Sequence, residues 1–203
     1  MWAVLVLEQY TRWAKYEVAR HFDAFKKDKF FSTMTNSLLA YEFVFKPALH
    51  VRFETCDRFM QGAFVPEADQ IILCSNVLTE QQDFNNAIKR MLVRMYDIKR
   101  SVDYNFDNCK HLACTEVRAA LFHSECNINE RSKLSVTRVS KDRQDANEFC
   151  VREKAIEFLS ERNKCSAKAD RYVNYVFEKC KIDYAPFSAG KSQRGVKNLT
   201  TIL

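Results

Sequence analysis

One short stretch of this 203-residue sequence brings together residue types that bind metals or attack carbonyl groups. His111 lies three residues before Cys114 and five before Glu116. With Asp97, His111 and Glu116 could supply a few nitrogen and oxygen ligands to a metal. A pair of His111 and Cys114 could act as a nucleophile, but only if the cysteine were a free thiolate. We expect instead that Cys114 is in a disulfide and that His111 lies on a helix face.

Two helices must position these residues. Apolar side chains recur every three or four residues over 84–95, which predicts a buried helix at 79–100. Thr79 and Gln82 have the spacing of a capping box, so we expect this helix to begin at Thr79. A shorter amphipathic helix is predicted at 111–122. A buried helix followed by one that carries Cys and Glu is a framework that could hold a metal or a catalytic group.

The rest of the chain predicts further helices and a small sheet. Only three Gly and three Pro occur, which leaves little room for the turns of an all-β fold, and the 47% of hydrophobic residues can form the core of one domain. Additional helices are predicted at 1–25, 35–45, 145–161 and 167–180. Alternating apolar and polar residues predict a strand at 49–55. Residues 62–76 are predicted to form a strand, a turn at 66–69 and a second strand, with the apolar run 71–74 in the interior of the sheet. The basic segment 123–144 is predicted to be a loop, and the basic tail 191–203 an arm that orders only against a partner.

The eight cysteines predict disulfides, with buried free thiols as the alternative. No two have the C-x-x-C spacing of a zinc knuckle, and their even number is typical of an oxidising compartment. In an antiparallel helical hairpin Cys150 and Cys180 would lie side by side, so we expect a bond between them. Cys165, at the turn, is expected to reach another element. The disulfide candidates are Cys56, Cys74, Cys109, Cys114, Cys126, Cys150, Cys165 and Cys180.

The N-terminal residues and the net charge bear on the choice of partners. The apolar run 1–7 is far too short to span a bilayer. Glu8 and Glu17 are atypical of an import sequence, so 1–25 is interpreted as a docking helix. A net charge of +6 allows contact with acidic proteins, anionic lipid or RNA, and it is equally compatible with an ordinary solvated surface.

Five segments of the sequence carry a resemblance to a known family. They are GAFVPEADQIILCSN, NCKHLACTEVRAA, SEC, EFCVREKA and NKCSAKADRYVNYVFEKCKIDYAPF. In this order, and with cysteines at similar places, they resemble the mitochondrial intermembrane-space metalloprotease of the Atp-twenty-three family. The resemblance covers 56–187, and the HLACTEVRAA block is its most specific part. It implies a zincin that processes a membrane subunit of ATP synthase and also acts as an assembly chaperone for it.

The zinc motif of that family, H-E-x-x-H, is absent from this sequence. In the motif, two His one turn apart bind zinc, and the Glu acts as general base toward the metal-bound water. The resemblance places these three positions at Arg90, Met91 and Arg94. A guanidinium has no lone pair for a metal and stays protonated, and a thioether is no base for water. We therefore expect no catalytic residue, no metal and no cofactor, and we predict that the protein is not an enzyme.

Two roles remain open for the arginines at these positions. Asp97 and Glu116 match acidic positions that lie near the dication in the family, and buried carboxylates without a metal need other positive partners. We expect both arginines to occupy the former metal site and to bridge to one of these carboxylates. The degenerate site would then comprise Arg90, Met91, Arg94, Asp97 and Glu116. The alternative is an exposed basic stripe for a phosphate, an anionic headgroup or RNA, made of Lys89, Arg90, Arg94, Lys99 and Arg100.

The predicted fold class is α+β. We expect a zincin-like domain in which a small β-sheet packs on a central helix, followed by a C-terminal disulfide-linked helical hairpin. Residues 1–46 would form an N-terminal helical extension for docking, 47–187 the degenerate zincin-like domain, and 188–203 a basic C-terminal tail.

These observations predict a non-catalytic pseudo-metalloprotease that serves as a structural or assembly subunit of a mitochondrial inner-membrane complex of the respiratory chain or ATP synthase. It would lie in the intermembrane space, peripheral on the inner membrane, and bind other protein subunits, with anionic lipid as a further contact. One alternative is an RNA-associated protein of the mitochondrial ribosome or its assembly. Basic residues do not alternate with aromatic ones to form stacking platforms, so nucleic acid is not expected. The second alternative is an active metalloprotease with bound zinc.

Overall fold

The computed structural model describes residues 2–57, 60–126, 141–162 and 164–187. The chain divides into two compact units, Met1–Tyr96 and Asp97–Leu203, with the boundary inside helix α4 (Gln81–Arg100). Helices and one small sheet occur together, which confirms the predicted α+β class. The division predicted at residues 46 and 187 stays a prediction.

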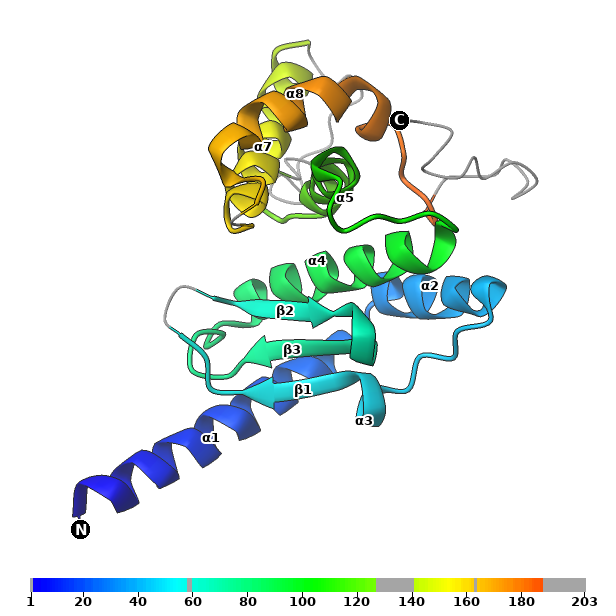
Figure 1. The fold of residues 1–203 in the computed structure, drawn as a ribbon. Coiled ribbons are helices and arrows are strands. Elements are labelled where there is room, and N and C mark those ends of the chain that lie inside the picture. Colours follow the sequence, from blue (N-terminus) through cyan, green and yellow to red (C-terminus); the bar gives the residue numbers. More distant parts are fainter. Residues whose placement is uncertain (1, 58–59, 127–140, 163, 188–203) are drawn as a thin grey trace. The chain divides into compact units, whose positions relative to one another are not determined.

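The first unit contains a three-stranded mixed sheet (Figure 1). Its strands are β1 (Val51–Glu54), β2 (Gly62–Val65) and β3 (Gln70–Cys74). β3 lies in the middle, parallel to β1 and antiparallel to β2, with Ile71 opposite both Val51 and Phe64. A Cβ atom at Gly62 would lie 2.6 Å from the Ile72 carbonyl oxygen, so only glycine fits where β2 begins. The two strands predicted within 62–76 are confirmed, joined by the 3-10 turn η2 (Pro66–Ala68).

Aromatic side chains join the helices of the first unit to its sheet. Helix α1 (Trp2–Phe25) places the Phe22 ring 6.0 Å from Phe53 of β1 and 6.3 Å from Phe84 of α4. Phe25 lies 6.4 Å from the same Phe84 ring. The C-terminal half of α1 is therefore part of the core of this unit. The other elements are α2 (Lys29–Leu38), η1 (Leu39–Tyr41) and α3 (Pro47–His50).

The helix expected at 35–45 lies earlier in the chain. It begins at Lys29 because Asp28 caps it, accepting a hydrogen bond from the Phe30 amide at 2.8 Å. Its 3-10 extension ends before Glu42, whose backbone is left-handed with a φ of 59°. The prediction missed the cap because residues 26–29 look like a simple charged break between helices.

Two other boundaries were also misplaced. α4 begins at Gln81, and the Phe84 amide donates to the carbonyl oxygen of Glu80 at 3.0 Å, so Glu80 and not Thr79 stands directly before the helix. The carbonyl oxygen of Thr79 lies 3.1 Å from Nε2 of His21. The predicted capping box at Thr79 is therefore wrong. β1 is shorter than the strand predicted at 49–55, because Pro47 occupies the first turn of the short helix α3.

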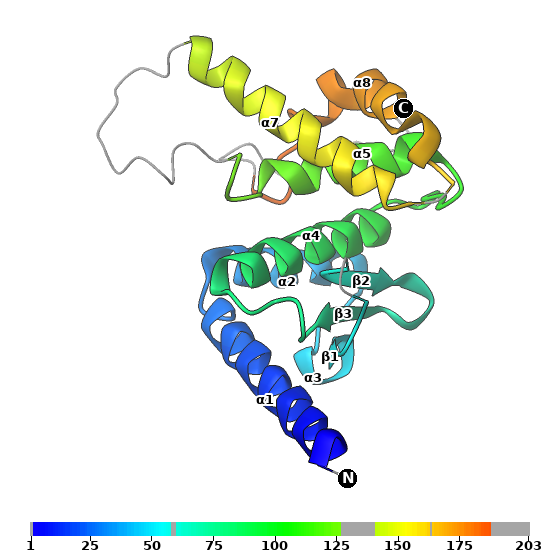
Figure 2. The same cartoon turned by 90° about the vertical axis from the view of Figure 1, so that its left-hand side faces the viewer.

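The second unit is helical. Helix α5 (Cys109–Leu121) begins where Asn108 accepts a hydrogen bond from the Lys110 amide at 3.0 Å. It packs against α7 (Lys141–Ser160) and α8 (Ala169–Cys180), which form the predicted hairpin through η3 (Ser166–Lys168) (Figure 2). Nearly every residue of α5 is buried, and its apolar residues form one core cluster with those of α7 and α8.

All eight cysteines are in disulfides, as predicted. The pairs are Cys56–Cys74, Cys109–Cys165, Cys114–Cys180 and Cys126–Cys150. Cys165 does reach another element, but the expected bond between Cys150 and Cys180 is wrong. The hairpin is not linked to itself, because α5 packs against both of its helices and supplies nearer partners. Three bonds therefore attach the hairpin to α5 and to the segment that follows it.

Parts of the sequence prediction fall outside the described residues. Most of the loop predicted at 123–144 and the whole tail at 191–203 belong to the undescribed ranges 127–140 and 188–203. Of the helices that the structure describes, none combines the length and the apolar content needed to cross a membrane.

Candidate functional site

The residues of the predicted degenerate site are all buried. They are Arg90, Met91, Arg94, Asp97 and Glu116. Within α4, Nη1 of Arg94 donates to the sulfur of Met91 at 3.6 Å. Arg100 is buried as well. The alternative of an exposed basic stripe along α4 is therefore wrong.

Asp97, near the end of α4, forms ion pairs with two arginines that the prediction did not assign to it. Its Oδ1 lies 3.0 Å from Nε of Arg100, one turn further along the helix. The same oxygen pairs with Nη1 of Arg118, which comes from α5. Asp97 and Arg118 are both fully buried. The positive charge that a buried carboxylate requires is thus supplied by α5 and by the last turn of α4.

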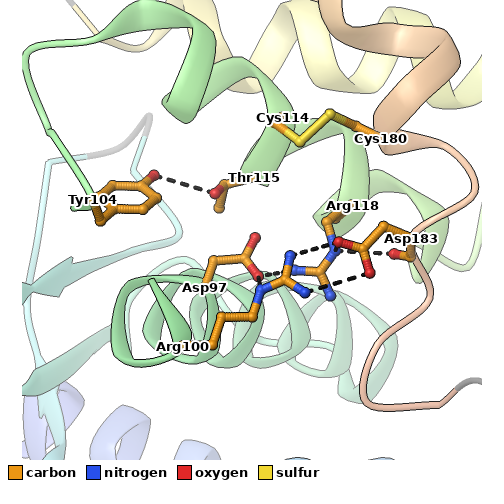
Figure 3. Close-up of a disulfide and its surroundings, with 8 residues drawn as sticks. All are labelled: Asp97, Arg100, Tyr104, Cys114, Thr115, Arg118, Cys180 and Asp183. Carbon is orange, nitrogen blue, oxygen red and sulfur yellow. Dashed lines mark hydrogen bonds and ion pairs between the residues drawn. A yellow bond between two sulfur atoms is a disulfide. The ribbon is translucent and has the colours of Figure 1, made fainter. Parts of the chain in front are cut away.

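Asp183, in the segment after α8, is the second carboxylate of this group of charges (Figure 3). Its Oδ2 lies 2.6 Å from Nη2 of Arg100 and 3.2 Å from Nε of Arg118. Arg118 also donates to the backbone carbonyl oxygens of Asp183 and Ala185. We call Asp97, Arg100, Arg118 and Asp183 the charge network. It contains two positive and two negative side chains, so the network is neutral when all four are ionised.

The pKa of Asp183 shows the balance of forces in the network. Burial alone would raise this pKa, because the charged form loses its hydration. The charge of Arg118, the hydrogen bond and charge of Arg100 and the Ala185 amide act in the opposite direction and hold the pKa below its ordinary value. Asp183 is therefore ionised at neutral pH, and it connects the end of α4 to α5 through the two arginines.

His111 and Cys114 do not form a nucleophilic pair. Cys114 is bonded to Cys180, so no thiolate is present, as expected. Burial lowers the pKa of His111, and its Nδ1 accepts a hydrogen bond from the Asn105 amide at 3.2 Å. The ring is thus neutral and helps to fix the loop before α5. The predicted position of His111 on a helix is confirmed.

The side chains of Arg90, Met91 and Arg94, which the resemblance aligned with the zinc motif, do not fit a zinc ion. Arginine has no lone pair for a metal, and buried Met91 is occupied as an acceptor from Arg94. Within the described ranges, no group of three or more His, Cys, Asp or Glu side chains is arranged to hold a metal ion. No metal-dependent step is derived for this chain.

The sequence did not identify Arg118 and Asp183 as site residues, and Arg100 was assigned only to the alternative of an exposed basic stripe. For Arg118 a signal was available. It stands between Val117 and Ala119 on a helix with few other charges, and an arginine in such a setting needs an acidic partner. Nothing near Asp183 marks it, because it belongs to a polar segment that could equally face solvent.

Together, the fold and the charge network define an α+β protein whose second unit is a helical bundle held by three disulfides and buried ion pairs. Residues 17–188 match the family described as the Peptidase M76 family. This chain belongs to the peptidase M76 family. The resemblance found in the sequence is thereby confirmed.

The curated relatives carry one name. The chain is 37% identical over 141 residues to the mitochondrial inner membrane protease ATP23 homolog of Danio rerio, covering 68% of this chain and 53% of the relative. It is 34% identical over 141 residues to that of Homo sapiens, covering 68% and 55%. It is 36% identical over 138 residues to the protein of Debaryomyces hansenii, covering 66% and 56%. The chain thus spans a little over half the length of these relatives. No solved structure matches it.

These comparisons correct one prediction and agree with another. The prediction that the protein is not an enzyme is contradicted, because the family is a peptidase family and the relatives are named proteases. The names of the relatives agree with the predicted location at the mitochondrial inner membrane.

Proposed function

We propose that this chain acts at the mitochondrial inner membrane, on its intermembrane-space side, as a structural or assembly subunit for a complex of the respiratory chain or ATP synthase. The relatives are named as proteins of the mitochondrial inner membrane, which supports this location, and the four disulfides support an oxidising compartment. A zincin-like arrangement of the first unit belongs to the same proposal. It is supported by family membership and by a small mixed sheet followed by the long buried helix α4.

The observation that carries the proposal is a pair of exposed large side chains beside a pocket on the second unit. Ile182 is 72% exposed and Tyr184 46% exposed, directly after α8. Both border a pocket of about 200 Å³ whose apolar walls include Val151 and Phe177. A pocket lined by both apolar and polar side chains, beside exposed large apolar side chains, is typical of a site where a partner protein inserts an anchoring residue.

Charged side chains also line the pocket. Nζ of Lys181 lies 2.8 Å from Oε2 of Glu148, and this ion pair joins the end of α8 to α7. A polar rim around an apolar centre is the usual composition of a protein interface. Because three disulfides and the charge network fix the second unit, a partner would meet a preformed surface, which lowers the entropic cost of binding.

The test is purification of the full chain from mitochondria in mild detergent, followed by identification of the proteins that co-purify. We expect subunits of a respiratory-chain or ATP synthase complex. Ile182→Asp should reduce their recovery about tenfold or more, since a buried charge at an interface centre costs at least that much affinity. Leu49→Asp is the matched control, because Leu49 is 59% exposed in the first unit and should leave recovery unchanged. A wild-type chain that purifies without such subunits would contradict the proposal, and co-purified RNA would favour the ribosomal alternative.

The same preparation tests the activity that the relatives are named for. The co-purified subunits are incubated with the chain, and new N-termini are sought by mass spectrometry. Cleavage at a defined bond would assign peptidase activity to this chain.

A further inference from the structure

Helix α1 presents two large aromatic side chains to solvent on the face opposite its packed side. Trp13 is 55% exposed and Tyr16, one turn further along the helix, is 68% exposed. The packed side is apolar and buried, and it includes Ala14, Val18 and Phe22. The helix therefore has an exposed aromatic face in addition to the apolar face that packs against its own unit.

α1 is longer than packing in the first unit requires. It has 24 residues, which corresponds to about 36 Å, and its N-terminal turns continue beyond the edge of the sheet (Figures 1 and 2). The sequence of these first turns, WAVLVL at 2–7, is wholly apolar. Both tryptophans of the chain, Trp2 and Trp13, belong to this helix. Tryptophan and tyrosine are the side chains enriched at the level of lipid headgroups.

Exposed cations accompany the aromatic pair. Arg12, Lys15 and Arg20 are all exposed on α1. Nζ of Lys15 lies 3.3 Å from Oε2 of Glu54, and Nη2 of Arg20 lies 2.7 Å from Oε2 of Glu17. Arg12 forms no ion pair among the described residues. Long basic side chains beside interfacial aromatics can reach lipid phosphates while their stems cover apolar surface.

We propose that α1 is the membrane-binding element of this protein and lies in the headgroup region of an anionic phospholipid bilayer, with Trp13 and Tyr16 inserted and Arg12 directed to phosphate. The choice of a bilayer rests on the proposed location at the inner membrane. A second copy of the chain fits this face less well, because a symmetric contact through α1 would bring Arg12, Lys15 and Arg20 of both copies together. An anionic lipid surface, in contrast, complements all three charges.

The position of the tryptophans makes the test specific. Because Trp2 and Trp13 are both in α1, the intrinsic tryptophan fluorescence of the full chain reports on this helix alone. We expect phosphatidylcholine vesicles with about 20% phosphatidylglycerol to shift the emission to shorter wavelength and to carry the protein upward in a flotation gradient. Vesicles of phosphatidylcholine alone should bind more weakly, and added salt should weaken binding to the anionic vesicles.

Two double variants separate insertion from general surface effects. Trp13→Ala with Tyr16→Ala should reduce vesicle affinity about tenfold or more. Phe149→Ala with Tyr175→Ala is the matched control, since Phe149 and Tyr175 are 66% and 58% exposed in the second unit. This control should bind vesicles like the wild type. All four residues are exposed, so circular dichroism should show the wild-type fold in both variants.

Three results would overturn the proposal. The first is a wild-type chain that does not bind anionic vesicles. The second is vesicle binding that survives the loss of Trp13 and Tyr16. The third is a blue shift of the emission without lipid that grows with protein concentration, which would assign the face to self-association. None of them affects the recovery of partner subunits through Ile182. Failure of membrane binding and failure of the proposed subunit role are therefore distinguishable.

Discussion

Arg100 at the end of α4 and Asp183 after α8 form an ion pair with Nη2 and Oδ2 2.6 Å apart, although 83 residues separate them in the sequence. Arg118 of α5 pairs with the same carboxylate and with Asp97. Three distant segments therefore meet at one buried group of charges. We therefore expect the charge network to stabilise the packing of these three segments in the second unit.

Replacing Arg118 by methionine should strongly destabilise the second unit. Arg118 is the largest fully buried side chain among the described residues, and its loss leaves Asp97 with one arginine in place of two. Removing one partner of a buried ion pair costs about 3–5 kcal/mol of unfolding free energy. Urea unfolding should be followed by far-UV circular dichroism, because both tryptophans lie in the first unit. Arg171→Met, at an exposed position of α8, is the control and should change stability by less than about 0.5 kcal/mol. Equal stability of the two variants would show that the network is not required.

Asp183→Asn should destabilise the protein in a pH-dependent way. The pKa of Asp183 is held below its ordinary value of 3.8, so its contribution is complete above that pH and is lost as the pH falls through the lowered pKa. At neutral pH the variant should lose about 1.5–3 kcal/mol, the typical worth of hydrogen bonds to a charged group. Urea midpoints of the two proteins, compared from neutral pH to pH about 3, should converge toward the acid end. A difference that is constant over this range would mean that the charge of Asp183 is unimportant.

Removing both disulfides, Cys109–Cys165 and Cys114–Cys180, should cost more than twice the unfolding free energy that removing either one costs. Their loops span 56 and 66 residues, but with one bond intact the other closes a loop of only about 20 residues. The chain-entropy relation then gives about 3 kcal/mol for removing either bond and about 7 kcal/mol for removing both. Unfolding of the paired Cys→Ala variants checks this, with Cys56→Ala/Cys74→Ala, whose loop has 18 residues, as an independent reference of about 3 kcal/mol. A double removal that costs no more than a single one would contradict the interleaved arrangement of the two bonds.

Protonation of His111 should oppose folding. Burial lowers its pKa, so the unfolded chain binds the proton first, and stability is complete above the ordinary pKa of 6.5 and declines as the pH falls below it. His111→Gln keeps an acceptor for the Asn105 amide without this titration. The melting temperature of the wild type should fall more steeply between pH about 7 and 5 than that of the variant. The His111 ring should titrate below 6.5 by NMR, and a midpoint above 6.5 would contradict the neutral, buried ring.

Much of the fold could be predicted because its elements follow local patterns. The apolar spacing over 84–95 predicted α4, and the apolar runs on either side of the turn at 66–69 predicted β2 and β3. Helix ends were less predictable. The cap at Asp28 and the engagement of Thr79 by His21 depend on a competition between hydrogen-bond partners, one of them 58 residues away. Sequence spacing carries no information on that competition.

The site was predicted only in part for a related reason. The burial of Arg90, Arg94 and Asp97 was expected from the family resemblance and not from the helical pattern, which places them away from the apolar stripe of α4. The partners of Asp97 come from the next turn of α4 and from α5. The predicted bond between Cys150 and Cys180 was wrong for the same reason. Four cysteines lie close together in the fold, and their spacing permits several pairings: Cys114, Cys126, Cys150 and Cys180. An alignment on the H-E-x-x-H positions also led to the wrong conclusion about enzymatic class.

The sequence by itself determined the α+β class, the long buried helix, the oxidised state of the cysteines and the family resemblance, because composition, periodicity and local motifs encode them. Tertiary structure alone decided which cysteines bond, which arginines neutralise Asp97 and that Asp183 completes the charge network. Those choices depend on distances of a few ångströms between segments that are dozens of residues apart. Chain packing sets such distances, and no local pattern records them.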